Sequence, residues 1–225
     1  MATGESVSPN KYDLIVFDWD GTIMDSTGLI AECIQLAARD RGLPIPSTES
    51  AKSIIGLGVH ESTRRLFPDL DHAAQLIFAL AYRKHFVARD HEAPVYAGIP
   101  ELLAGLDNPG RFLAVATGKP RAGLERAFGH TGLKSTFHFS RCADEGFAKP
   151  HPDMLLKLMD FTAVPPERTL MIGDTIHDLE LASNANVAAV AVTYGAHSAE
   201  LLGTRRAVHI VDTVKELAQW LKSHA

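Results

Sequence analysis

The chain has 225 residues, which is enough for one large domain or for a core that carries a small second unit. Hydrophobic residues make up 46% and charged residues 22%, which is ordinary globular usage and excludes disordered, collagen-like and coiled-coil chains. The formal net charge of −5 lacks the basic excess of nucleic-acid binders, so no nucleic-acid partner is expected.

The first predicted element is a short strand that ends in two carboxylates. Residues 1–10 are polar and carry no signal-peptide pattern, so we expect a frayed tail there. Residues 12–17 (YDLIVF) are apolar and rich in β-favouring side chains, which predicts a buried strand. The run stops abruptly at the sequence DWDGT, so this strand would deliver Asp18 and Asp20 to an acidic loop.

An all-helical block is predicted next, over residues 26–93. Apolar residues recur at helical spacing between Gly28 and Arg41, and the turn sequence Gly42-Leu43-Pro44 ends that pattern. No strand is expected in the remainder of the block. Three further helices are predicted there, over residues 48–55, 60–67 and 71–89.

Beyond residue 94 the chain alternates between helices and strands. Helices are predicted over residues 100–106, 121–128, 153–161, 178–184 and 214–223, and strands over residues 112–116, 137–140, 169–172, 188–193 and 208–211. Such alternation is typical of a mostly parallel sheet with helices on both faces. We therefore predict a Rossmann-like, doubly wound α/β core of residues 1–25 and 94–225, with an inserted all-helical cap of residues 26–93.

Polar side chains follow several of the predicted strands, where parallel sheets bind ligands. Asp18 and Asp20 follow the first strand, Thr117 the second, and Asp174 a later one. Lys149 follows another strand by a loop and could reach the same edge. Magnesium prefers one or two carboxylates plus phosphate oxygens, and an aspartate can form an aspartyl-phosphate. These residue types therefore predict a site for Mg²⁺ and a phosphate group.

Four motifs, in this order, resemble those of the haloacid dehalogenase-like hydrolase superfamily. They are Asp18-Trp19-Asp20-Gly21-Thr22, Thr117-Gly118, Lys149-Pro150 and the GDTIHD sequence of residues 173–178. The resemblance covers the chain from about Tyr12 to the C-terminal helix. The helical insert is similar to the cap of the branch that contains phosphoglycolate phosphatase and β-phosphoglucomutase.

The resemblance implies a chemical role for four of these side chains. Asp18 would be the nucleophile that takes the phosphoryl group. Asp20 would be the general acid that protonates the leaving alcohol and then deprotonates the attacking water. Thr117 and Lys149 would hold the phosphoryl oxygens, and Lys149 would also offset repulsion between nucleophile and substrate.

The same resemblance implies the metal ligands and the remaining contacts. Asp18, Asp174 and the backbone carbonyl of Asp20 would surround Mg²⁺, while Asp178 would orient this set from behind. Lys119 and Arg121 either add to the positive field at the phosphate or face solvent. Additional substrate or phosphate contacts are expected from Gly21, Thr22, Gly118 and the cap residue Arg64.

These roles predict a Mg-dependent phosphatase that hydrolyses small phosphomonoesters through an aspartyl-phosphate, with phosphoglycolate-like substrates expected first. A sugar-phosphate mutase and a small-molecule pyrophosphatase would use the same residues, so both remain alternatives. A catalytically silent binding module is disfavoured because Asp18, Asp20, Lys149 and Asp174 are all present. Asp20 also disfavours dehalogenase chemistry, which needs no general acid at that position.

Cysteine content and hydropathy favour a cytoplasmic protein. Cys33 and Cys142 are too few and too widely spaced for a disulfide framework or a paired-cysteine metal site. No stretch approaches the roughly 20 apolar residues that span a bilayer, so no membrane association is expected. The expected partner is a small phosphorylated metabolite, and the expected assembly is a monomer or a homodimer.

Overall fold

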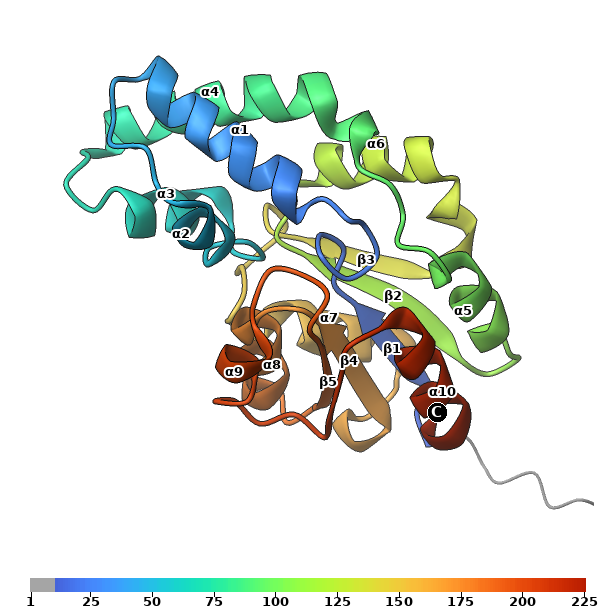
Figure 1. Cartoon of the computed structure of the whole chain (residues 1–225). Helices are drawn as coiled ribbons and strands as arrows, with labels where there is room; N and C mark the ends of the chain where they lie inside the picture. Colours follow the sequence, from blue (N-terminus) through green and yellow to red (C-terminus); the bar gives the residue numbers. More distant parts are fainter. Residues whose placement is uncertain (1–10) are drawn as a thin grey trace, which may run out of the picture.

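A parallel sheet of six strands lies at the centre of the computed structural model, which describes residues 11–225 (Figure 1). The tail expected over residues 1–10 lies outside the described residues. The strand order is β3-β2-β1-β4-β5-β6. The strands span Leu14–Phe17 (β1), Phe112–Thr117 (β2), Phe139–Cys142 (β3), Thr169–Gly173 (β4), Ala188–Val192 (β5) and His209–Val211 (β6).

Two sets of helices cover the two faces of this sheet. One face packs against α5, α6 and α10, which span Ile99–Leu106, Arg121–Thr131 and Val214–His224. The other packs against α7, α8 and α9, which span Asp153–Thr162, Ile176–Asn184 and Ala199–Leu202. Alternate side chains of β1 enter both cores, so a continuous apolar run is what this central strand requires. The predicted Rossmann-like, doubly wound sheet is confirmed.

The strand order reverses at β1. β2 and β3 lie on one side of β1, and β4, β5 and β6 lie on the other. In sheets of this kind, ligands bind outside the carboxyl ends of the strands at the point of reversal. The fold therefore directs attention to the residues that directly follow β1, β2 and β4.

Four helices from the segment between β1 and α5 form a separate layer beyond this edge of the sheet (Figure 1). They are α1 (Thr27–Asp40), α2 (Thr48–Lys52), α3 (Val59–Leu66) and α4 (His72–Arg89). They share a buried apolar cluster of their own, which includes Ile34, Phe78 and Phe86. We call these helices and their connections the helical layer.

The two connections between the helical layer and the sheet lie side by side. Met24 forms an antiparallel bridge with Val95, and the Asp25 amide donates a hydrogen bond to the Pro94 carbonyl at 2.9 Å. The chain therefore leaves the core and returns to it at one place.

Most differences from the predicted elements are shifts at their ends. β3 begins at Phe139, two residues after the predicted start, and a 3₁₀ turn over Leu133–Thr136 comes before it. α8 begins two residues before the predicted start, because Thr175 and Asp178 form a reciprocal cap at its N-terminus. The four-residue helix α9 was not predicted. Further 3₁₀ turns span Asp90–Glu92 and Pro166–Arg168. Within residues 11–225, no helix combines the length and apolar character needed to cross a membrane.

Candidate active site

Three strand ends bring the expected site residues together. Asp18 directly follows β1, Thr117 is the last residue of β2, and Asp174 directly follows β4. β1 pairs with both β2 and β4, and the Asp18 amide donates to the Ile172 carbonyl at 2.8 Å. All three side chains are buried.

Lys149 links two of the carboxylates. Its ammonium donates to Asp18 Oδ1 and to Asp178 Oδ1, at 2.6 Å in each case. All three side chains are excluded from solvent. Burial works against the charged ammonium, but the two carboxylates outweigh it and raise the pKa of Lys149. Lys149 therefore stays positively charged inside the site.

Asp178 is held on both of its oxygens. Oδ1 accepts from Lys149, and Oδ2 accepts from the Thr175 amide at 3.1 Å and the Thr175 hydroxyl at 2.7 Å. The resemblance placed Asp178 behind the metal ligands. The contacts place it behind Lys149, which in turn contacts Asp18.

Asp174 is fixed by its neighbours in a similar way. Its Oδ1 accepts from the Thr22 hydroxyl at 2.9 Å, and its Oδ2 accepts from the Ala196 amide at 2.7 Å. Burial raises the pKa of Asp174. Gly21 has a φ of +86°, and a Cβ there would lie 2.0 Å from Asp174 Oδ2. Gly21 and Thr22 were both expected to contact the phosphate. In the structure, the absence of a side chain at Gly21 leaves room for Asp174, and Thr22 donates a hydrogen bond to it.

The carboxylates have the properties of a divalent-cation site. Oxygens of Asp18, Asp174 and Asp178 lie within 4.8 Å of one another. Burial raises the pKa of Asp18 to about 7, although Lys149 offsets part of the rise. Among the described residues, Asp18 Oδ2 is buried without a hydrogen-bond partner. A hard cation would compensate the buried negative charge of this cluster. Asp18 and Asp174 follow neighbouring strand ends and could share such an ion. Both oxygens of Asp174 also accept hydrogen bonds from the protein, as do both oxygens of Asp178.

Asp20 lies beside these groups with partners of its own. Its Oδ1 accepts from the Ser26 hydroxyl at 2.6 Å and forms an ion pair with the Lys119 ammonium at 3.0 Å. The Lys119 ammonium also lies 4.5 Å above the ring of Phe86 on α4. The sequence left open whether Lys119 and Arg121 lie at the site or face solvent, and the structure places Lys119 at the site. Arg121 instead pairs with Glu145 at 2.8 Å.

Gly118 is a point of close approach between the core and the helical layer. A Cβ at this position would lie 2.6 Å from the Gly56 carbonyl oxygen and 2.8 Å from that of Leu57. The segment between α2 and α3 therefore rests on Gly118. The Thr117 hydroxyl also stabilises this turn, because it accepts a hydrogen bond from the Lys119 amide at 3.1 Å.

Two histidines of the core hold the same segment. His177 Nε2 and His197 Nε2 lie 3.2 Å and 3.3 Å from the Ser53 carbonyl oxygen. His197 Nδ1 accepts from the Ile176 amide, so its proton is on Nε2 and donates to Ser53. Burial lowers the pKa of His177 to about 4 and also lowers that of His197. Sequence reasoning did not identify His197 or this contact.

Arg64, expected to contact the substrate, is not brought to the site. It pairs with Glu61 at 2.7 Å and is 66% exposed. Arg65 pairs with the same carboxylate at 2.8 Å. Because both guanidinium groups engage Glu61 on their own helix, neither lines the cavity described next.

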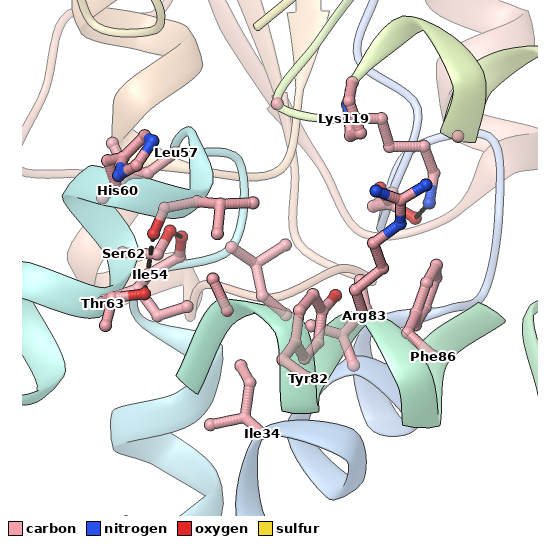
Figure 2. Close-up of a pocket in the computed structure, with 18 of the residues that line it drawn as sticks. Ile34, Ile54, Leu57, His60, Ser62, Thr63, Tyr82, Arg83, Phe86 and Lys119 are labelled. Atoms are coloured by element: carbon pink, nitrogen blue, oxygen red, sulfur yellow. Dashed lines mark hydrogen bonds and ion pairs between the residues drawn. The ribbon is translucent and has the colours of Figure 1, made fainter. Parts of the chain in front are cut away.

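A cavity of about 530 Å³ lies between the helical layer and the strand ends (Figure 2). Asp18, Asp20, Thr117 and Lys119 line it from the core. Most of the remaining wall is apolar and comes from α1, α3, α4 and the segment leading into α3. Figure 2 shows Tyr82 and Phe86 of α4 on the side of the cavity opposite Leu57.

Comparisons with known proteins agree with this geometry. The model of the haloacid dehalogenase-like hydrolase family matches residues 15–192. The chain is 33% identical over 210 residues to "Probable phosphatase IndB" of Dickeya dadantii (strain 3937), covering 91% of each chain. It is 30% identical over 216 residues to a phosphoglycolate phosphatase of Pseudomonas savastanoi pv. phaseolicola, covering 91% of this chain and 78% of that one.

A solved structure shows the same arrangement. A "predicted phosphatase" from Clostridium acetobutylicum superposes with a TM-score of 0.85 at 27% identity, covering 94% of this chain and 99% of the other. The match includes both the sheet and the helical layer, because so little of either chain is left out. Given the family match, the relatives and the buried aspartate cluster at the strand ends, the chain belongs to the haloacid dehalogenase-like hydrolase family and is a phosphatase.

Proposed function

We propose that the protein is a Mg²⁺-dependent phosphatase that hydrolyses small phosphomonoesters through an aspartyl-phosphate at Asp18. The observation that carries this proposal is the asymmetry of the Asp18 carboxylate. Lys149 holds Oδ1 at 2.6 Å, while Oδ2 is buried without a partner among the described residues. One oxygen is thereby fixed and the other is left for reaction.

Asp18 and Asp20 divide the chemistry between them. Oδ2 of Asp18 attacks phosphorus, and the bond from phosphorus to the leaving oxygen breaks. Asp20 gives a proton to that oxygen and later takes one from the water that attacks the aspartyl-phosphate. Ser26 and Lys119 both contact Oδ1 of Asp20, which leaves Oδ2 for the proton transfer.

Three further groups prepare the reaction. Lys149 places a permanent positive charge beside the nucleophile and the incoming phosphate. The Thr117 hydroxyl oxygen accepts a hydrogen bond from the Lys119 amide, so its own proton is available for donation to a phosphoryl oxygen. Asp18 and Asp174 would hold Mg²⁺, which when bound neutralises charge on the phosphoryl group. The carbonyl of Asp20 as a third ligand stays a prediction.

The helical layer acts as a cap over this site in our proposal, with residues 26–93 as the moving unit and residues 1–25 and 94–225 as the catalytic core. The single crossing point at Met24 and Val95 supports this division. Closure would exclude water from the phosphoryl transfer. An ion pair between Asp90 and Arg126, at 2.9 Å, joins the two units beside α6.

We also propose a cytoplasmic location, with a small phosphorylated metabolite as the substrate. Both cysteines are free and buried. Burial raises the pKa of Cys33 to about 11 and that of Cys142 to about 12, so both thiols are protonated and inert at neutral pH. Such cysteines are typical of a reducing compartment.

The test of the proposed function is phosphate release from a panel of monoesters that includes phosphoglycolate, hexose phosphates and nucleotides. Wild type should release phosphate with Mg²⁺, lose turnover in EDTA, and regain it when Mg²⁺ is restored. Ca²⁺ should inhibit, because its larger and looser oxygen shell misplaces the nucleophile. Full turnover in chelator would overturn the metal requirement, and an isomerised product without phosphate release would indicate a mutase.

A further inference from the structure

The leaving group of the substrate has to extend into the cavity of the helical layer. Asp20, which would protonate the leaving oxygen, lines this cavity together with Lys119. The Lys119 ammonium lies directly over the ring of Phe86. The wall next to the general acid is therefore already apolar, and the carbon skeleton attached to the leaving oxygen meets it first.

Apolar side chains make up most of this wall. Ile34 of α1, Ile54 and Leu57 of the segment before α3, and Leu80 and Phe86 of α4 all line the cavity. Figure 2 shows Ile54 and Leu57 across the space from Tyr82 and Phe86. Such a wall offers few partners to a polar or hydroxylated leaving group, whose water shell would be lost without replacement.

The charged groups of the cavity, which also include Asp144, come mostly from the core side. Lys119 is paired with Asp20, and Arg126 is paired with Asp90. A small carboxylate beside the phosphate would have to compete with Asp20 for Lys119. Arg83 of α4 also lines the cavity, and Figure 2 shows its side chain extending from α4 toward Lys119, so its guanidinium lies near the phosphate end of the space rather than on the apolar wall.

The volume exceeds what a two-carbon leaving group can fill. The cavity holds about 530 Å³, in the range of sites for ring-containing ligands. Roughly 150 Å³ is enough for a benzene molecule. A ring with a short chain therefore fits between α4 and Leu57, whereas a glycolate group leaves most of the wall without contact.

We propose that the substrates are monophosphate esters of bulky apolar alcohols, with an aromatic ring or a branched chain as the leaving group. This inference rests on the proposed function for the chemistry, and on the cavity for the substrate class. It makes the helical layer select mainly by hydrophobic contact with the apolar side chains of α1, α4 and the segment before α3.

The first experiment compares kcat/KM for methyl, butyl, hexyl and benzyl phosphate with that for phosphoglycolate, all in Mg²⁺. Each added methylene should raise kcat/KM by about two- to fourfold until the cavity is filled. Benzyl phosphate should exceed methyl phosphate and phosphoglycolate by at least about tenfold. A preference for phosphoglycolate, or equal values across the alkyl series, would overturn the inference while leaving the proposed function intact.

A second measurement needs no turnover. Calorimetry in Mg²⁺ compares the binding of benzylphosphonate with that of methylphosphonate. Neither compound can be hydrolysed, because each has a carbon–phosphorus bond in place of the ester bond. Benzylphosphonate should bind at least about tenfold more tightly and with a more negative heat-capacity change, the signature of apolar burial. Equal affinity overturns the inference. Tighter benzylphosphonate binding without hydrolysis of any ester would overturn the proposed function, while the cavity's preference for an apolar group would stand.

Two pairs of variants locate the effect on α4. Ala79 lines the cavity and Ala88 does not, so Ala79→Leu narrows the space while Ala88→Leu makes the same change elsewhere on the helix. Leu80→Ser and Ile77→Ser form the second pair. Both side chains are exposed, but Leu80 lines the cavity and Ile77 does not, so Ile77→Ser is the control.

The quantity compared is the ratio of kcat/KM for benzyl phosphate to that for methyl phosphate. It should fall at least about fivefold in Ala79→Leu and about threefold in Leu80→Ser. Both control variants should keep the wild-type ratio. A ratio that responds equally to the cavity and control changes would place substrate selection outside this cavity and overturn the inference.

Discussion

The Lys119 ammonium lies 3.0 Å from Asp20 Oδ1 and 4.5 Å above the Phe86 ring, so one side chain joins Asp20, the proposed general acid, to α4 of the helical layer. Opening of the layer would withdraw Phe86 from Lys119 while leaving Lys119 beside Asp20. The position of the layer and the environment of the acid are therefore coupled through this residue.

Replacement of Lys119 should impair proton transfer more than nucleophilic attack. We expect Lys119→Met to lower kcat/KM for an alkyl phosphate at least about tenfold more than for an aryl phosphate, whose leaving group needs little protonation. Arg121→Met is the matched control, because Arg121 pairs with Glu145 outside the site. Equal losses on both esters would show that Lys119 does not act through Asp20.

Asp20→Asn should show the same dependence on the leaving group more strongly. General acid catalysis is worth about 10²–10⁴-fold, and that factor should be lost on alkyl esters and largely retained on aryl esters. Steady-state kinetics on the two ester types measure it. If both types lose activity equally, Asp20 acts through its backbone or is structural.

Removal of Lys149 should destabilise the protein as well as inactivate it. Lys149→Met leaves Asp18 and Asp178 buried together without their shared cation. Loss of one partner of a buried ion pair costs about 3–5 kcal/mol, so the urea midpoint should fall clearly. A free energy of unfolding within about 0.5 kcal/mol of wild type, typical of surface substitutions, would contradict the buried arrangement.

Stability should fall as the solution becomes acidic, in part because of His177. Its folded-state pKa is about 4, below the unfolded value of about 6.5. The unfolded chain therefore binds the proton more readily, and the contribution present above pH 6.5 is lost as the pH falls toward 4. His177→Asn should flatten the unfolding free energy between pH 7 and 5. The exposed His209→Asn should keep the wild-type slope, and an identical slope in both variants would refute the assignment.

Gly118→Ala should hinder the contact between the core and the helical layer. The added Cβ would lie 2.6 Å from the Gly56 carbonyl oxygen, so the segment before α3 must move away. Faster amide hydrogen exchange over residues 53–58 is the expected result. Gly129→Ala is the control, since a Cβ there meets nothing within 4 Å and should stabilise α6 by roughly 0.5–1 kcal/mol. Unchanged exchange in Gly118→Ala would mean that the layer tolerates the displacement.

The sheet and the strand-end residues were predictable because local patterns determine them. A buried parallel strand requires a continuous apolar run, as in residues 14–17, and the next residue must then lie at its carboxyl end. Asp18, Thr117 and Asp174 followed from that rule alone. The hydrogen-bond partners of these residues did not follow from that rule. Lys149, for example, reaches Asp178 through loop conformations that no periodicity encodes.

The helical layer shows where sequence patterns stop being informative. Arg64 and Lys119 are both cations that the sequence offered for the site, yet Arg64 pairs with Glu61 one helical turn away while Lys119 pairs with Asp20. Its position two residues after Thr117 is the only sequence signal for Lys119. The cavity was not predictable, because its walls come from α1, α4 and an intervening segment whose packing fixes the space between them.

The most direct test of the account is to trap the covalent intermediate. Wild-type protein with Mg²⁺ and an excess of a phosphomonoester carrying a labelled phosphoryl group is quenched in acid within one turnover and digested. The label should lie on the peptide that contains Asp18, and Asp18→Asn should carry none there. Label on another residue, or phosphate release by Asp18→Asn at the wild-type rate, would contradict the assignment of Asp18 as the nucleophile.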